Sequence, residues 1–210
     1  MLSPAAEDVL LEYNARLAKE EAQMQAAMSS GAPLDRDAML LAVGEAPARF
    51  LHALAIARGA KHILEIGTSY GYSTLFLASA AKATGGRLTT LELAPEKQAH
   101  ARAMLTRAGL ADHVDWRLGD AVKLIETIEG PFDFILLDLW KELYIPCFER
   151  FYPKLAENGL IVADNIIFPP MYRAEAEAYR AAVAAKPDLQ SVLLPIGSGM
   201  ELSCRWSKQV

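Results

Sequence analysis

Short apolar runs alternate with longer stretches of helical periodicity along most of this 210-residue chain. The runs predicted to be strands are His62–Ile66, Arg87–Glu92, Val114–Leu118, Phe132–Asp138, Leu160–Ala163, Ser191–Ile196 and Met200–Arg205. The helices expected between them are Tyr72–Lys82, Pro95–Ala108, Ala121–Glu129, Leu143–Tyr152 and Tyr172–Ala185. Such alternation predicts right-handed crossover units and a parallel sheet with helices on both faces.

The last two predicted strands are separated only by Gly197-Ser198-Gly199. This connection is too short for a parallel crossover, so the two strands form a hairpin and the last strand runs antiparallel. The predicted fold class is therefore a Rossmann-like α/β domain with a seven-stranded, mostly parallel sheet.

The N-terminal residues 1–58 are predicted to be a helical addition to an α/β core of residues 61–206, within one domain of residues 1–210. Pro4–Met28 has the apolar spacing of an amphipathic helix. A second helical stretch is expected from near Asp35 through Met39, Leu40 and Leu41, and a third runs from about Pro47 to Arg58. The sequence leaves open whether these helices only pack on the core or form a lid or a dimer surface.

Composition narrows the possible classes of protein. An apolar fraction of 52% with 22% charged residues fits a soluble globular protein, and a net charge of −5 without basic runs argues against nucleic-acid binding. We find no membrane-spanning run and no signal peptide, so a cytoplasmic location is expected and no membrane partner. Cys147 and Cys204 lack metal-ligand spacing and are predicted to be free buried thiols in a reducing compartment.

The pattern E-x-G-x-x-x-G-x-S from Glu65 to Ser73 follows the first predicted strand and opens a helix. A strand, a glycine turn and a helix bring backbone amides close to a ligand. Glu92 ends the next predicted strand, where a carboxylate accepts hydrogen bonds from ribose hydroxyls in nucleotide-binding folds. The pair indicates a nucleoside-containing cofactor, although glycines that serve packing alone are the simpler alternative.

The glycine spacing distinguishes between cofactors. The G-x-G-x-x-G pattern of dinucleotide folds is absent, which disfavours a dehydrogenase. Glu65 is badly placed for a phosphate and well placed for a cation, and S-adenosylmethionine carries an ammonium and a sulfonium but no phosphate. Gly119-Asp120-Ala121, after the third strand, is expected near the adenine, although Asp120 is an equally good cap for the helix that follows.

Asp138, Asp164 and Asn165 lie at the ends of two further strands. Their hard oxygen donors suit Mg²⁺, which can bind two adjacent hydroxyls of a substrate and lower their pKa; a turn with local hydrogen bonds is the alternative for Asp164-Asn165. Beside such a cation, Lys141 could lose its proton and act as a general base, whereas most lysines at a helix start lie on the surface. Trp140 is expected either in the core or as a wall of the site.

These motifs resemble those of the cation-dependent O-methyltransferases of the class I S-adenosylmethionine fold, which include catechol and caffeoyl-CoA O-methyltransferases and small bacterial relatives. The resemblance covers about Leu41 to Arg205. It rests on Leu64-Glu65-Ile66-Gly67 with Gly71-Tyr72-Ser73, Leu91-Glu92, Val43-Gly44, Asp138-Leu139-Trp140-Lys141 with Tyr144, and Ala163-Asp164-Asn165-Ile166-Ile167 with Pro169. The glycine motif is common to class I methyltransferases, whereas the Asp138…Lys141 and Asp164-Asn165 pairs are specific.

The resemblance implies the role of each site residue. It implies cofactor contacts from Val43, Glu65, Gly67, Ser69, Ser73, Glu92, Leu93, Gly119, Asp120, Ala121, Asp138 and Trp140. It implies a divalent cation (Mg²⁺, Mn²⁺ or Ca²⁺) on Asp138, Asp164 and Asn165, and Lys141 as the catalytic base. It places Met39, Leu41, Trp140, Lys141, Asn165 and Pro169 around a small catechol-like acceptor. It further implies a homodimer through the N-terminal helices.

Two departures from the catechol enzymes bear on the acceptor. Met39 stands about where those enzymes carry a tryptophan, and no acid clearly matches the one that contacts the second hydroxyl. The acceptor is therefore expected to be larger than a simple catechol or more loosely held. The alternative functions are a metal-independent class I methyltransferase acting on another small molecule and a non-catalytic S-adenosylmethionine-binding module.

Overall fold

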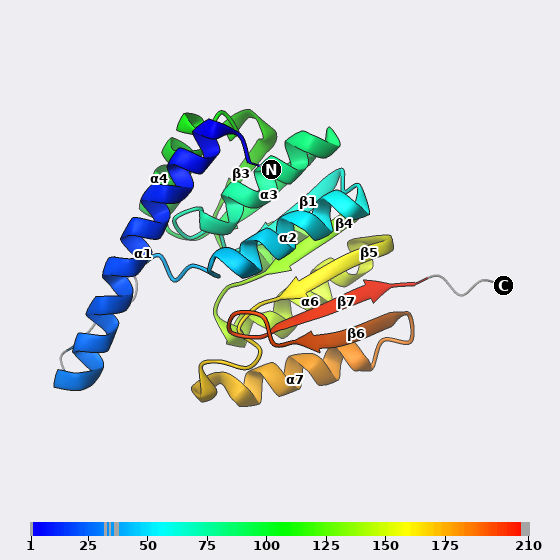
Figure 1. The fold of residues 1–210 in the computed structure, drawn as a ribbon. Helices are drawn as coiled ribbons and strands as arrows, with labels where there is room; N and C mark the ends of the chain where they lie inside the picture. Colours follow the sequence, from blue (N-terminus) through cyan, green and yellow to red (C-terminus); the bar gives the residue numbers. More distant parts are fainter. Residues whose placement is uncertain (1, 32, 34, 36–37, 207–210) are drawn as a thin grey trace.

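The computed structural model describes residues 2–31, 33, 35 and 38–206. Its centre is a seven-stranded sheet in the order β3-β2-β1-β4-β5-β7-β6 (Figure 1). The strands are β1 (His62–Ile66), β2 (Arg87–Glu92), β3 (Val114–Leu118), β4 (Phe132–Leu137), β5 (Leu155–Ala163), β6 (Leu189–Leu194) and β7 (Met200–Arg205). β1 to β5 pair in parallel, and β7 runs antiparallel to both β5 and β6. The predicted Rossmann-like sheet is confirmed.

Helices cover both faces of this sheet (Figure 1). They are α1 (Pro4–Ser30), α2 (Glu45–Arg58), α3 (Tyr72–Thr84), α4 (Pro95–Arg107), α5 (Ala121–Thr127), α6 (Tyr144–Phe151) and α7 (Arg173–Ala184). Short 3₁₀ turns span Ala111–His113, Lys141–Leu143, Tyr152–Lys154 and Pro170–Tyr172. The first four helices bury one apolar core against the sheet, and α5, α6 and α7 bury a second core on the opposite face.

The side chains of β4 alternate between the two apolar cores. Phe134 and Leu136 belong to the core under α1–α4, and Ile135 and Leu137 belong to the core under α5–α7. Successive side chains of a strand point to opposite faces, so a strand covered on both faces has no polar alternation. Residues 134–137 of β4 accordingly carry no polar side chain.

The predicted second N-terminal helix is wrong for the residues that the structure describes. Residues 38–44 contain no α-helix, and Leu41 has a positive φ of 45°. The start of this predicted helix lies partly at residues 34, 36 and 37, outside the described residues. The backbone groups of Leu40 bond to Glu20 and Ser69, which come from elsewhere in the chain, in place of helical partners.

Other boundaries differ modestly. β5 begins at Leu155, five residues before the predicted start, and β4 ends at Leu137, one residue before Asp138. Cys147 and Cys204 are free thiols, as predicted; Cys147 is buried as expected, whereas Cys204 is only half-buried. None of the helices that the structure describes is long and apolar enough to cross a bilayer.

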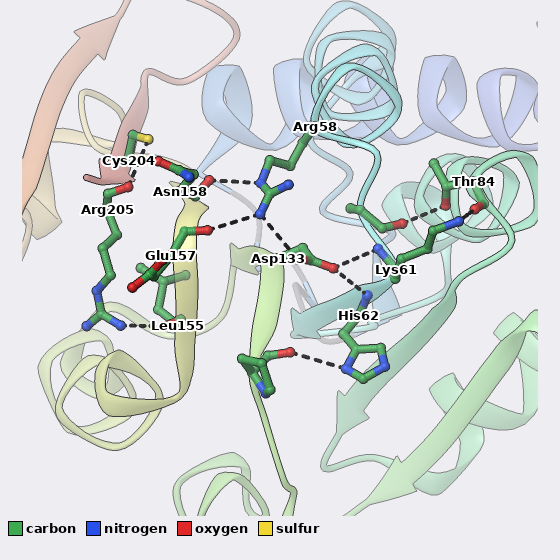
Figure 2. Close-up of polar contacts among 12 residues, drawn as sticks. Arg58, Lys61, His62, Thr84, Asp133, Leu155, Glu157, Asn158, Cys204 and Arg205 are labelled. Atoms are coloured by element: carbon green, nitrogen blue, oxygen red, sulfur yellow. Dashed lines mark hydrogen bonds and ion pairs between the residues drawn. The ribbon is translucent and has the colours of Figure 1, made fainter. Parts of the chain in front are cut away.

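A polar cluster at the amino end of the sheet joins α2, β1, β4 and the first half of β5 (Figure 2). The Asp133 carboxylate accepts hydrogen bonds from the backbone amides of Lys61 (2.8 Å) and His62 (3.0 Å) and from the Arg58 guanidinium (3.3 Å). Arg58 also donates to the carbonyls of Glu157 (3.1 Å) and Asn158 (2.9 Å). The cluster thus fixes the strand ends that lie opposite the carboxyl edge.

We expect Asp133→Ala to lower the free energy of unfolding by about 1–3 kcal/mol, because it leaves two backbone amides and a partly buried guanidinium without their acceptor. Urea denaturation of the two proteins measures the change. Asp115→Ala is the control, since it removes only an exposed pair with Arg117 and should cost about 0.5 kcal/mol or less. Equal losses in the two variants would contradict the assignment.

Candidate functional site

The turns after β1, β4 and β5 meet at the carboxyl edge because these strands are neighbours in the sheet. The amide of Asp138 donates to the carbonyl of Ile66 (3.0 Å), and the amide of Asp164 donates to that of Leu137 (3.1 Å). Gly67 has a φ of 108°, and a Cβ at this position would lie 1.9 Å from the Asp138 carbonyl oxygen. Only glycine allows the turn to pack this closely.

Lys141 lies inside this edge, with 5% of its surface exposed. Its Nζ donates to the Leu139 carbonyl and the Asn165 Oδ1, both at 3.1 Å, and to the Tyr144 hydroxyl. It also lies 4.0 Å from the Asp138 Oδ1. The structure thus brings Asp138, Lys141 and Asn165 together, and the alternative of an ordinary surface lysine is wrong.

Asp164 completes this cluster from the end of β5. Its side chain is buried, and its Oδ1 has no hydrogen-bond partner within the part of the chain that the structure describes. Burial and the neighbouring Asp138 raise the pKa of Asp164 to about 8, against the smaller opposing effects of the Asn165 amide and Lys141. Burial likewise raises the pKa of Asp138, and Lys141 opposes that shift. The two carboxylates are therefore short of positive charge.

The cluster fits a divalent cation. An unpaired buried carboxylate oxygen, a second carboxylate and an amide oxygen form a hard oxygen donor set. Asn165 adopts a left-handed conformation (φ 52°), which asparagine tolerates, and its Oδ1 reaches the same Lys141 Nζ. Among the described residues, no group of three or more histidine, cysteine, aspartate or glutamate side chains could hold a metal. A cation at this set would therefore need the Asn165 amide oxygen as a third protein ligand.

Burial lowers the pKa of Lys141, and Asp138 and Asp164 partly oppose this effect. A buried ammonium is disfavoured relative to the neutral amine. Burial therefore increases the fraction of Lys141 that is neutral, and the neutral amine is the form that can act as a base. The Tyr144 hydroxyl, which holds Lys141, lies 3.0 Å and 2.9 Å from the carbonyls of Leu137 and Asp164. The local sequence assigned no role to this tyrosine.

Glu92 lies on the other side of the edge, at the end of β2, and is held by backbone amides. Its Oε2 accepts from the Ser69 amide (2.7 Å), and its Oε1 accepts from the amides of Leu93 and Ala94 (both 2.9 Å). The carboxylate is therefore fixed in orientation beside the glycine turn. Its contact with a ribose stays a prediction.

Glu65 is enclosed. It has no exposed surface, and its carboxylate accepts hydrogen bonds from the hydroxyls of Ser73 (2.6 Å), Thr74 (2.7 Å) and Thr90 (2.6 Å). Burial raises its pKa to about 7 although these hydrogen bonds lower it. The geometry assigns Glu65 and Ser73 to holding the turn against α3. Their direct contact with a cofactor stays a prediction that this enclosed geometry does not favour.

The remaining candidates differ in exposure. Asp120 caps α5 by accepting from the Lys123 amide (3.1 Å), which supports the capping alternative. Leu93, Trp140 and Leu41 are 72%, 43% and 38% exposed and so are open to a ligand. Gly119, Ala121 and Pro169 are half-buried, and Val43 and Met39 are buried.

The hairpin turn between β6 and β7 holds the loop after Asn165 by backbone hydrogen bonds. The sequence did not predict this contact. The amide of Ile166 donates to the Gly199 carbonyl (2.9 Å), and that of Phe168 donates to the Ser198 carbonyl (3.0 Å). Ile167 and Phe168 remain exposed at 48% and 54%. These contacts join segments far apart in sequence, so no local pattern could have indicated them.

Comparison with known proteins decides the family. The family described as O-methyltransferase matches residues 17–206. The chain belongs to the O-methyltransferase family.

Catechol O-methyltransferase of Mycobacterium tuberculosis is 39% identical over 166 residues, which cover 78% of this chain and 72% of that protein. Caffeoyl-CoA O-methyltransferase 1 of Eucalyptus globulus is 30% identical over 177 residues, covering 75% and 71%. A catechol O-methyltransferase of Niastella koreensis is 42% identical over 123 residues, covering 57% of this chain and 55% of that protein.

Solved structures agree with this O-methyltransferase fold. Cofactor-bound Rv0187 from MTB has a TM-score of 0.77 at 28% identity, covering 97% of this chain and 90% of that one. An O-methyltransferase from Bacillus cereus in complex with SAH has a TM-score of 0.71 at 29% identity, covering 88% and 97%. The family and its enzymatic nature, both predicted from the motifs, are confirmed.

The raised pKa of Asp164 makes the stability of the metal-free O-methyltransferase depend on pH. Between about pH 4 and pH 8 the folded protein retains a proton that the unfolded chain has released, so the free energy of unfolding falls as the pH rises. Asp164→Asn removes this contribution. We expect its stability relative to wild type to improve by about 2 kcal/mol or more from pH 4 to pH 8.

Urea denaturation in the presence of a chelator at several pH values measures this difference. Asp112→Asn, which changes an exposed carboxylate, is the control and should follow the wild-type pH profile. Parallel profiles for Asp164→Asn and wild type would show that Asp164 is not a high-pKa group.

Proposed function

We propose that this chain transfers a methyl group from S-adenosylmethionine to one hydroxyl of a small catechol-like acceptor, with the help of a divalent cation. The observation that carries the proposal is the cluster of Asp138, Asp164 and Asn165 around the buried Lys141, in which the Asp164 Oδ1 has no hydrogen-bond partner among the described residues. A buried carboxylate and a second, partly buried one beside a buried lysine are costly for the fold, and a cation that binds an acceptor gives them a function.

The names of the relatives support the acceptor class. Two relatives are called catechol O-methyltransferases, and a third is called a caffeoyl-CoA O-methyltransferase. The Bacillus cereus relative was solved with SAH, which supports the methyl donor. The exposed side chains of Trp140, Ile167 and Phe168 near the cluster in sequence offer apolar surface that suits an aromatic acceptor.

The residues of the cluster divide the chemistry. A divalent cation held by Asp138, Asp164 and Asn165 would supply Lewis acidity that lowers the pKa of an acceptor hydroxyl. The neutral Lys141 Nζ accepts the proton of that hydroxyl, and the lowered pKa of Lys141 makes this neutral form available. The acceptor oxygen then forms a bond to the methyl carbon as the bond to sulfur breaks, and S-adenosylhomocysteine leaves. Glu92 and the glycine turn orient the methyl donor, so positioning contributes to the rate.

A methyl-transfer assay tests this proposal, with labelled S-adenosylmethionine and a panel of catechols, caffeoyl esters and flavonoid diols. We expect product with Mg²⁺, and a loss of about a hundredfold or more with chelator and in Asp164→Ala, since both remove the stabilisation of the acceptor oxygen. Methyl transfer that is insensitive to chelator would favour the metal-independent alternative. Tight donor binding without turnover on any vicinal diol would contradict the proposal and favour a binding module.

The role of Lys141 predicts a pH dependence. The neutral amine is the active form, so the rate should rise with pH as Lys141 loses its proton and then level off. Burial moves this rise below the ordinary range of a lysine.

Lys141→Arg keeps the charge but cannot release a proton, so we expect a loss of about 10²–10⁴-fold in turnover. Single-turnover rates across the pH range measure both effects. Lys19→Met, an exposed change, should keep the wild-type profile, and an active Lys141→Arg variant would exclude the base role.

The homodimer through the N-terminal helices remains a proposal that rests on the resemblance alone. Sedimentation of the purified chain tests it independently of activity.

A further inference from the structure

Helix α1 reaches the glycine turn and does not merely cover the core. The Tyr13 hydroxyl donates to the Tyr70 carbonyl (2.6 Å), and the Arg16 guanidinium lies 4.2 Å from the centre of the Tyr70 ring. In Figure 1 the helix runs along one side of the molecule, past α4. One face of α1 is therefore in direct contact with the turn that is predicted to hold the methyl donor.

Arg16 and Glu20, one and two turns further along α1, form hydrogen bonds to the backbone of Ala38 and Leu40 in the segment that precedes α2. The Glu20 carboxylate is 7% exposed; its Oε1 accepts from the Arg16 Nε (2.7 Å) and its Oε2 from the Leu40 amide (2.8 Å). A second nitrogen of Arg16 donates to the Ala38 carbonyl (2.7 Å). Charge-assisted hydrogen bonds of this kind are short and directional, so the pair fixes both a donor and an acceptor of this backbone.

The contacts continue from Leu40 to the candidate donor site. The Ser69 hydroxyl donates to the Leu40 carbonyl (3.1 Å), and the Ser69 amide donates to the Glu92 Oε2 (2.7 Å). Glu20, Leu40, Ser69 and Glu92 thus form a continuous chain of hydrogen bonds. It connects α1, the segment before α2, the glycine turn and the end of β2.

We infer that Arg16 and Glu20 are positioning residues for the methyl donor. They hold the backbone of Ala38 and Leu40 and, through Ser69, the Glu92 carboxylate. This inference rests on the proposed function. Residues 39–43 lie outside any helix or strand, so their conformation depends on such outside partners. Without Glu20 the binding-competent arrangement should be less populated, and the apparent affinity for the donor falls by the same factor.

A purely structural role and a positioning role differ in what they change. Loss of packing alone would lower the melting temperature and leave donor affinity in the folded protein unchanged. Loss of positioning raises the KM for S-adenosylmethionine, while kcat at saturating donor stays close to wild type, because the chemistry resides at Lys141. Donor affinity and kcat together therefore separate the two roles.

The test compares Glu20→Ala and Glu20→Gln with Glu12→Gln. Glu12 also lies on α1, but its carboxylate forms an exposed bidentate pair with Arg107 of α4 (2.7 and 2.8 Å) and no bond to Leu40 among the contacts of the described residues. S-adenosylhomocysteine serves as the probe, with its Kd measured by calorimetry, and NMR hydrogen exchange reports the Leu40 amide. Steady-state kinetics with a vicinal diol follow for any variant that folds.

We expect Glu20→Ala to weaken the probe about tenfold, as for loss of one hydrogen bond to a charged group, and to speed exchange of the Leu40 amide. Glu20→Gln keeps one acceptor oxygen and should restore part of the affinity. Glu12→Gln should match wild type in both measurements. If Glu20→Ala binds the probe as wild type does, the positioning role is refuted while the proposed function stands. If wild type itself does not bind the probe, the proposed function fails, and with it this inference.

Discussion

The charge balance at the carboxyl ends of β4 and β5 is the constraint on which the site depends. Asp138 and Asp164 are brought together by neighbouring parallel strands, and the sheet is covered by helices on both faces. Water solvates Asp164 poorly and Asp138 only in part, so both carboxylates rely on Lys141, and Asp164 relies also on a hydrogen bond from the Asn165 backbone amide. The fold tolerates this arrangement because the two apolar cores supply the stability that the strand ends do not.

The same edge couples the two halves of the site through backbone packing. The glycine turn that is expected to hold the methyl donor lies directly against the Asp138 carbonyl at Gly67. On its other side the turn holds Glu92 through the Ser69 amide. The expected donor site and the candidate metal site therefore share one turn, and Glu65, just before this turn, bonds two hydroxyls of α3 and one of β2. Such sharing suits a reaction in which the donor methyl and the acceptor oxygen must be aligned.

The structure also gives the N-terminal region a definite place. The sequence left open whether these helices only pack on the core, form a lid or form a dimer surface. In the structure α1 packs on α4 and α3, contacts the glycine turn through Tyr13, and bonds the Leu40 amide through Glu20. The addition is thus connected to the glycine turn and to the segment before α2 by hydrogen bonds as well as by apolar contacts.

The sequence by itself determined the order and type of the elements and the family. Apolar runs such as those of β1 and β4 and the glycines of the first turn are local signals, because buried strands and tight turns restrict residue type locally. Asp138, Lys141, Asp164 and Asn165 were found because parallel strands end at one edge. The tertiary structure alone decided that Lys141 is buried against Tyr144, that Glu65 is enclosed, and that residues 38–44 are not helical. Each of these depends on partners distant in sequence, whose hydrogen bonds and desolvation override local propensity.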